Sequence, residues 1–146
     1  IKSMKANELR IGNLIASGVK YNDTSVVGKV LSIGLEECAF EQIYCECPES
    51  FEWFFKDNYC GIPLTPEILE KCGFKKRRDE EYLFSIDLDK HISIVVNKDN
   101  FFPMLLQDAE FSGGELNVYF CNLINYLHQL QNLYFAITGE ELEVKL

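Results

Sequence analysis

The sequence of 146 residues predicts an α+β fold, in which a small β-barrel-like lobe is followed by a lobe of helix, four-stranded antiparallel meander and helix. Three observations predict this class. The first sixty residues contain short segments of alternating apolar and polar residues, and residues 62–74 carry the start and stop signals of a helix. Residues 82–138 then resemble several strands followed by a longer helix. We expect the lobes to span residues 4–61 and 62–146 and to pack as one compact unit.

The N-terminal lobe is expected to consist of four or five short strands. The segments "LRIGNLI" (residues 9–15) and "VVGKVLSIG" (26–34) alternate, and "CAFEQIYCEC" (38–47) and "FEWFF" (51–55) are rich in aromatic residues. A flat sheet of such strands leaves its apolar face and its edges uncovered, whereas a curled sheet covers both. We therefore predict a small barrel. Residues 1–3 precede Met4 and are expected to come from a vector.

A short helix is predicted within "IPLTPEILEKCGF", residues 62–74. Thr65 is a good N-cap, and Pro66 suits the first helical position. Gly73 favours the left-handed conformation that ends a helix, and Phe74 can then fold back onto Leu69.

The remaining segments predict a meander and a closing helix. Strands are expected in "YLFSIDL", "HISIVV", "FFPMLL" and "ELNVYF", with turn residues between them. Pro103 lacks a backbone donor, so the third of these strands is expected at an edge or at a bulge. The last helix is predicted from about Asn122 to Thr138 and ends at Gly139, with leucines recurring every three or four residues.

Composition and charge narrow the possible functions. The net charge of −9 opposes binding along a phosphate backbone, so nucleic acid is not an expected partner. The basic run of residues 75–78 is followed at once by three acidic residues, and we expect a solvated hairpin tip there. No apolar stretch is long enough for a membrane span, and the six cysteines lie in apolar segments, so we expect a cytoplasmic protein with reduced thiols.

Few residues are arranged for catalysis or metal binding. Cys45 and Cys47 form a single C-x-C, whereas structural zinc usually takes paired knuckles and often histidine, so we expect two small hydrophobic residues on one strand face. Cys121 and His128 are seven residues apart, but Cys121 follows an apolar strand and is expected to be buried and inert. Nucleophile-elbow, P-loop and dinucleotide motifs are absent. We predict no catalytic residue, metal site or cofactor.

Three segments carry a family resemblance: "KANELRIGNLI", "GIPLTPEILEKCGF" and "YLHQLQNLYFAITGEEL". In this order they resemble an uncharacterised family of small proteins encoded by Bacteroidetes, their phages and other mobile elements. The resemblance covers most of the chain, and its last motif is the most specific. It implies an accessory protein of a phage or mobile element, and it transfers no catalytic residue.

The polar side of the closing helix is the first candidate site. Asn125, His128, Gln129, Gln131 and Asn132 are expected to lie away from the leucine stripe. Amides can hydrogen-bond across an interface without the desolvation cost of buried ions, so this face suits a partner protein or a second copy of the chain. A polar face in contact with water is the alternative interpretation.

The favoured hypothesis is a non-enzymatic protein-interaction module that binds a host or phage protein. The second hypothesis is a protein that binds or sequesters a small, nucleotide-like ligand between the lobes. Its base would stack on aromatic residues, which we expect to be Trp53, Phe54, Tyr59 and Phe74. A small enzyme is the third hypothesis.

Overall fold

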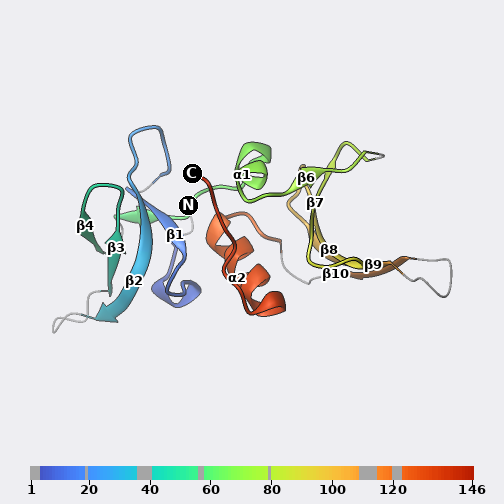
Figure 1. Cartoon of the computed structure of the whole chain (residues 1–146). Helices are drawn as coiled ribbons and strands as arrows, with labels where there is room; N and C mark the ends of the chain where they lie inside the picture. Colours follow the sequence, from blue (N-terminus) through green and yellow to red (C-terminus); the bar gives the residue numbers. More distant parts are fainter. Residues whose placement is uncertain are drawn as a thin grey trace. The chain divides into compact units, whose positions relative to one another are not determined.

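The computed structural model describes residues 4–18, 20–35, 41–55, 58–78, 80–108, 115–119 and 123–146. The chain forms two compact units (Figure 1). The first unit contains residues 1–63 and 126–141, and the second contains residues 64–125 and 142–146. Both combine an antiparallel sheet with a helix, which confirms the predicted α+β class.

The first unit is built on an open five-stranded antiparallel sheet in the order β4-β3-β2-β1-β5. Its strands are β1 (Leu14–Ser17), β2 (Val27–Leu35), β3 (Glu41–Glu46), β4 (Phe51–Phe55) and β5 (Tyr59–Cys60). The predicted barrel does not close, because β5 pairs with β1 and not with β4. Closure is also unnecessary, since residues in and beside the short 3-10 helix η1 (Ala6–Glu8) pack against the apolar face.

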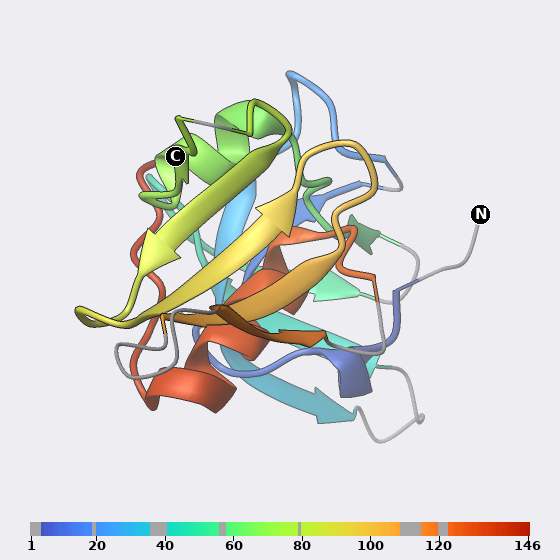
Figure 2. The same ribbon diagram turned by 90° about the vertical axis from the view of Figure 1, so that its right-hand side faces the viewer.

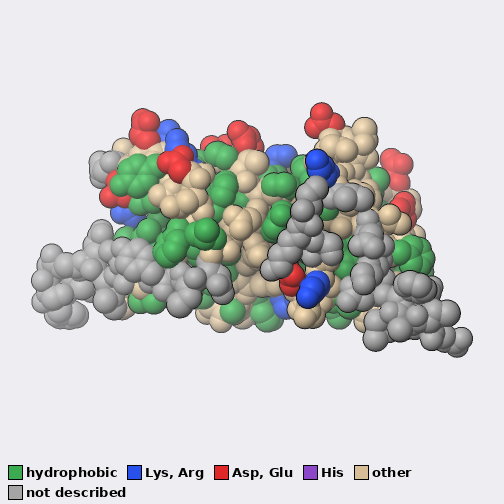
Figure 3. Space-filling view, turned by 180° about the vertical axis from the view of Figure 1, so that it is seen from behind, with side chains coloured by type: hydrophobic (Ala, Val, Ile, Leu, Met, Phe, Trp, Pro, Cys, Tyr) green, Lys and Arg blue, Asp and Glu red, His purple; other side chains and the backbone are tan. Residues whose placement is uncertain are grey.

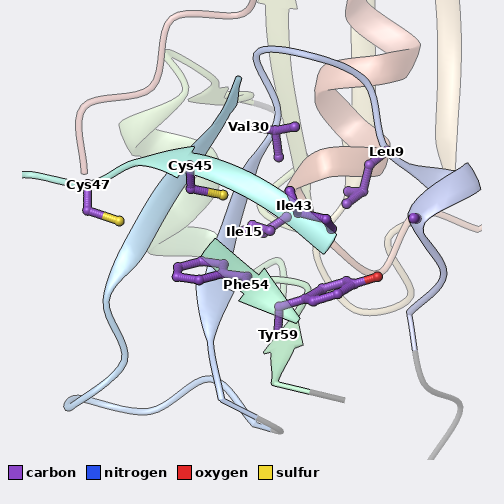
Figure 4. Packing of buried hydrophobic residues seen from close by; sticks show 9 residues of the cluster. Leu9, Ile15, Val30, Ile43, Cys45, Cys47, Phe54 and Tyr59 are labelled. Atoms are coloured by element: carbon purple, nitrogen blue, oxygen red, sulfur yellow. The ribbon is translucent and has the colours of Figure 1, made fainter. Parts of the chain in front are cut away.

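The core of the first unit lies on one face of this sheet. Val30, Ile43 and Phe54 come from three neighbouring strands and are almost completely buried. Figure 4 shows the rings of Phe54 and Tyr59 beside the aliphatic residues. The complete cluster is Ala6, Leu9, Ile15, Val30, Ile43, Cys45, Cys47, Phe54 and Tyr59, with Met4 packed against it. Cys45 and Cys47 are thus small hydrophobic core residues, as predicted.

The last helix, α2 (Leu127–Thr138), belongs to the first unit, so the prediction of one lobe over residues 62–146 is wrong. The helix begins later than predicted, and Gly139 ends it with a φ of 74°, as predicted. The N–H of Leu14 donates to Oε1 of Gln131 at 2.8 Å, and Nδ2 of Asn13 donates to Oδ1 of Asn132 at 2.9 Å. These bonds tie the polar side of α2 to β1 and the loop before it.

An ionic contact also holds the end of α2 to the N-terminal segment. Two guanidinium nitrogens of Arg10 donate to the two carboxylate oxygens of Glu141, the second at 2.9 Å. The same guanidinium lies over the ring of Phe135, 4.0 Å from its centroid. The hydrogen bond from Arg10 is the main reason why the pKa of Glu141 lies below its usual value.

The helix of the second unit is α1 (Pro66–Lys71), and both of its predicted ends are confirmed. The N–H of Ile68 donates to Oγ1 of Thr65 at 3.2 Å. Gly73 has a φ of 84°, and the N–H of Phe74 returns to the carbonyl of Leu69 at 3.0 Å. The phenyl ring of Phe74 is buried.

The sheet of the second unit is a meander whose strands follow the chain order, as Figure 2 shows. Its strands are β6 (Lys75–Lys76), β7 (Leu83–Asp87), β8 (Ile92–Asn97), β9 (Pro103–Asp108) and β10 (Glu115–Tyr119). The four predicted strands are present, and β6 is a short fifth strand. Leu83, Val95 and Leu106 form a buried cluster with Met104 against it.

The prediction that Pro103 marks an edge or bulged strand is wrong. β9 lies between β8 and β10. Pro103 is its first residue and pairs with Val96 of β8, while the described pairing with β10 begins at Met104. The missing N–H therefore falls at the start of the strand, which is a position where proline is tolerated.

We predict that Gly28→Ala destabilises the first unit by about 1–3 kcal/mol, because a Cβ at this position overfills the core. It would lie 2.7 Å from Cβ of Cys45 and 3.2 Å from the ring of Phe54. Gly34→Ala is the matched control in the same strand, because a Cβ there meets no atom within 4 Å. Urea denaturation of both variants measures the effect, and equal stabilities would contradict the prediction.

We also predict that Gln131→Leu lowers the free energy of unfolding by about 1–3 kcal/mol, because the N–H of Leu14 loses its acceptor. Gln131 is only 2% exposed, so water does not readily replace it. Ala136→Gln, at an exposed position of the same helix, should stay within about 0.5 kcal/mol of the natural protein. The stabilities of the two variants and the natural protein are compared by thermal and urea denaturation. A Gln131→Leu variant as stable as the control would show that the amide contributes little to the free energy of unfolding.

Candidate functional site

Three aromatic side chains project from the outer side of β4. Phe51, Trp53 and Phe55 are 60%, 48% and 42% exposed, whereas Phe54 between them is 4% exposed and lies in the core. Successive side chains of a strand point to opposite faces, so the three exposed rings share one face. We call Phe51, Trp53 and Phe55 the aromatic row.

Tyr44 of β3 extends this surface onto the neighbouring strand. It lies directly opposite Trp53 in the sheet, and their ring centroids are 4.7 Å apart. Its ring also stacks on Phe51 at 6.0 Å, with an angle of 22° between the planes. Such cross-strand aromatic pairs stabilise each other and restrict ring motion, so the surface is partly ordered before any partner arrives.

The aromatic row lies in an acidic part of the chain. Residues 41–55 contain four glutamates and no lysine or arginine. Glu46 pairs with Phe51 across the strands, and Glu52 separates Phe51 from Trp53 in β4. Glu49 is exposed in the turn that joins the two strands. Lys29 of β2 is opposite Glu46 on its other side and is the nearest base in the register.

The rest of the charge pattern is mixed. On the face of the molecule in Figure 3, hydrophobic side chains lie beside acidic ones, with lysines and arginines scattered between them. The basic run predicted to form a hairpin tip provides strand β6, and Nζ of Lys76 lies 3.9 Å from a carboxylate oxygen of Glu81.

β4 is an edge strand, with β3 on one side and no described strand on the other. Edge strands are prone to pair with other chains unless they are short or carry lysine, proline or an inward charge. At the edge of the other sheet, β6 has two residues, both exposed lysines. β4 has five residues, with three exposed rings on one face and one charged residue, Glu52, on the other face beside Phe54. β4 is therefore longer than β6 and lacks its exposed lysines.

The predicted partner-binding face of α2 is not an open surface. His128 is fully buried and Gln131 is 2% exposed, so the expectation that they face outward is wrong. Asn132 is half-buried and also donates to the carbonyl of Glu8 at 3.1 Å. Gln129 is half-buried, and its Oε1 accepts from the N–H of Tyr126 at 3.1 Å. Asn125 alone among the predicted residues is exposed.

The four aromatic residues predicted to stack on a ligand differ in their exposure. Phe54 and Tyr59 belong to the core cluster, and Phe74 is 2% exposed, so these three present no free face to a ligand. Trp53 is exposed as a stacking residue must be. Phe51, Phe55 and Tyr44 were missed by sequence reasoning, although the alternation within "FEWFF" contains the signal for the first two.

His128 is unusual because neither ring nitrogen has a hydrogen-bond partner among the described residues. Its ring stacks on Tyr126 with 5.8 Å between the centroids. Burial lowers its pKa to about 4, so the imidazole is neutral at physiological pH. Cys121, the nucleophile considered for it, lies outside the described residues.

The thiols of the described cysteines are poorly suited to nucleophilic chemistry. Burial, followed by the charges of Cys47 and Glu52, raises the pKa of Cys45 to about 12, and burial alone raises the pKa of Cys72 to about 12. Across the described ranges, no group of three or more histidine, cysteine or acidic residues is placed to hold a metal ion. No described helix has the length and apolar character needed to cross a membrane.

A shallow polar hollow occurs in the loop between β1 and β2. Its lining residues are Ser17, Gly18, Lys20, Asn22, Thr24 and Ser25. Oδ1 of Asn22 accepts hydrogen bonds from the backbone and hydroxyl of Thr24 at 3.0 and 2.7 Å. These contacts are those of a turn that stabilises itself, and they do not define a ligand site.

We predict that acid destabilises the protein through His128. An unfolded histidine binds a proton near pH 6.5 and the folded one near pH 4, so the contribution of the neutral ring is complete above pH 6.5 and is lost as the pH falls to about 4. The total loss is on the order of 3 kcal/mol. Urea denaturation between pH 7 and pH 4 should show a weaker pH dependence for His128→Leu. An identical dependence in both proteins would contradict the assignment.

Comparison of the chain with protein-family models, with curated proteins and with solved structures found no match. The aromatic row is the most distinctive exposed feature among the described residues.

Proposed function

We propose that this protein is a non-enzymatic protein-interaction module that contacts its partner through the aromatic row and Tyr44. The observation that supports this proposal is the exposure of Phe51, Trp53 and Phe55 on one face of an edge strand. Aromatic residues are enriched at the centres of protein interfaces, and tryptophan and tyrosine are over-represented among the residues that dominate binding.

The three rings of the aromatic row lie outside the core of the first unit. The core cluster contains Phe54 but none of the three exposed rings. Truncation of a central interface tryptophan typically costs about 2 kcal/mol or more of binding free energy. A partner that covers the row would remove three large apolar surfaces from water at once, with little loss of entropy because Tyr44 already restricts two of them.

The other hypotheses have less support. A nucleotide stacked on Trp53 would bring its phosphates among the glutamates of β3 and β4, which repel them. For an enzyme, a nucleophile needs an accessible base nearby, whereas burial raises the pKa values of Cys45 and Cys72 and encloses the imidazole of His128. The family resemblance further supports a phage or mobile-element setting. In that setting the partner is a host or phage protein in the cytoplasm.

We predict that replacing the three rings of the aromatic row by serine abolishes partner retention while the fold remains. Tagged natural protein and the Phe51→Ser/Trp53→Ser/Phe55→Ser variant are compared on resin in lysate of a Bacteroidetes host, and retained proteins are identified by mass spectrometry. Folding is checked by circular dichroism and by the melting temperature.

The matched control replaces exposed hydrophobic residues elsewhere, namely Ile11, Tyr82 and Leu123, which are 60%, 47% and 47% exposed. Proteins lost with the row variant and kept with the control would support the proposal. A retained set that is the same for all three proteins would show that the aromatic row is not the interface.

A further inference from the structure

We propose that the partner binds as an extended, lysine- or arginine-rich segment that pairs with β4 as a sixth strand of the first sheet. This inference rests on the proposed function, and it specifies the chemistry and the geometry of the partner. It is drawn from three features of the same strand, namely an edge with no described strand beside it, its aromatic row and the glutamates around it.

This edge of β4 determines the shape of the partner. β4 pairs with β3 over all five residues, from Phe51 to Phe55, so its backbone is fully extended. In an antiparallel sheet the N–H and C=O groups of an edge strand that point away from the neighbour are available to another chain. An added strand satisfies these groups and places every second side chain over the outer face, where the rings lie.

The glutamates determine the charge of the partner. A segment with lysine or arginine at the positions over the outer face would place its cations beside Phe51 and Trp53, where they could lie against the ring of Trp53, with Glu46 of β3 on the far side of Phe51. Glu49 and Glu52 are exposed and extend the negative field along the strand. Opposite charges at such an interface favour the correct partner and accelerate association.

The same charges disfavour other occupants of this edge. A second copy of the chain that paired β4 with β4 would bring two sets of glutamates together, with Glu46, Glu49 and Glu52 on each side. Like charges brought together at an interface disfavour association. Phosphates of nucleic acid or of an acidic membrane would meet the same repulsion. A basic polypeptide segment is the occupant that the charges favour.

The experiment uses the intrinsic fluorescence of Trp53, which is the single tryptophan of the chain and is 48% exposed. The probe is a ten-residue peptide of alternating lysine and valine, and the comparison peptide alternates glutamate and valine. We expect saturable displacement of the tryptophan emission to shorter wavelength with the lysine peptide only. A third peptide carries N-methyl groups on alternate lysine-valine amides, which removes the donors of one edge, and it should not bind.

Charge variants test the origin of the selectivity. Glu46→Gln/Glu49→Gln/Glu52→Gln should weaken binding of the lysine peptide about tenfold and reduce its salt dependence. The control is Glu70→Gln/Glu81→Gln/Glu143→Gln, which removes the same charge from exposed positions of the second unit and should change the affinity less than twofold. Equal effects of the two triple variants would mean that only net charge matters, and this would overturn the inference.

Other outcomes separate the inference from the proposed function. Equal binding of the lysine and glutamate peptides, or full binding of the N-methylated peptide, would overturn the proposal that a basic segment pairs with β4. Neither result would contradict retention of a partner from lysate through the aromatic row. Failure of the lysine peptide together with row-dependent retention would also overturn that proposal and preserve the interaction module. If retention in lysate does not depend on the row, the proposed function fails whatever the peptides do. A dimer broken by the Phe51→Ser/Phe55→Ser variant would identify a second copy as the occupant and overturn the inference.

Discussion

The first unit depends on the contact between the polar side of α2 and the beginning of β1. Gln131 accepts from the N–H of Leu14 and Asn132 accepts from Asn13, although more than a hundred residues separate the partners in sequence. Arg10 adds a bidentate salt bridge to Glu141. Without these bonds the donors of β1 would lose their acceptors, and the buried leucines of the helix would lose the position that the amides give them. The first unit is therefore incomplete until residues 131–141 have been made, which makes its folding dependent on distant contacts.

Local sequence signals were sufficient to predict the elements whose structure depends on neighbouring residues. Thr65, Pro66 and Gly73 all lie within a few residues of α1 and correctly marked its two ends. The alternation of residues 82–120 correctly gave the meander, and the apolar surroundings of Cys45 and Cys47 correctly placed them in the core. Each of these predictions needs only the period of a helix or strand and the chemistry of its caps.

The errors concern distant partners. Gln131 and His128 have the same chemical character whether they face water or the interior of the unit, and no property of the sequence near them reveals which of the two environments they occupy. The predicted barrel failed for a similar reason, because closure depends on which strand β5 selects. For the candidate surface, the sequence did contain the answer in part. Trp53 and Phe54 were predicted to act together, but adjacent residues of a strand point to opposite faces, so only one of them is on the surface.

The aromatic row and part of the core lie on opposite faces of the same two strands, β3 and β4. The packing of one face therefore constrains the positions of the side chains on the other. Inward-facing Ile43 and Phe54 fix the register of β3 and β4, and this register sets Tyr44 opposite Trp53. Slippage by one residue would exchange the two faces. The packing of the interior thereby maintains the arrangement of the exterior rings.

The isolated bridge between Pro63 and Tyr126 lies where the chain passes between the first unit and residues 64–125. These two residues are the points where the polypeptide leaves the first unit and returns to it, and they are paired with each other. A segment whose ends meet in this way can be gained or lost through a single loop without disturbing its host. Residues 64–125 thus form a continuous insertion between two segments of the first unit.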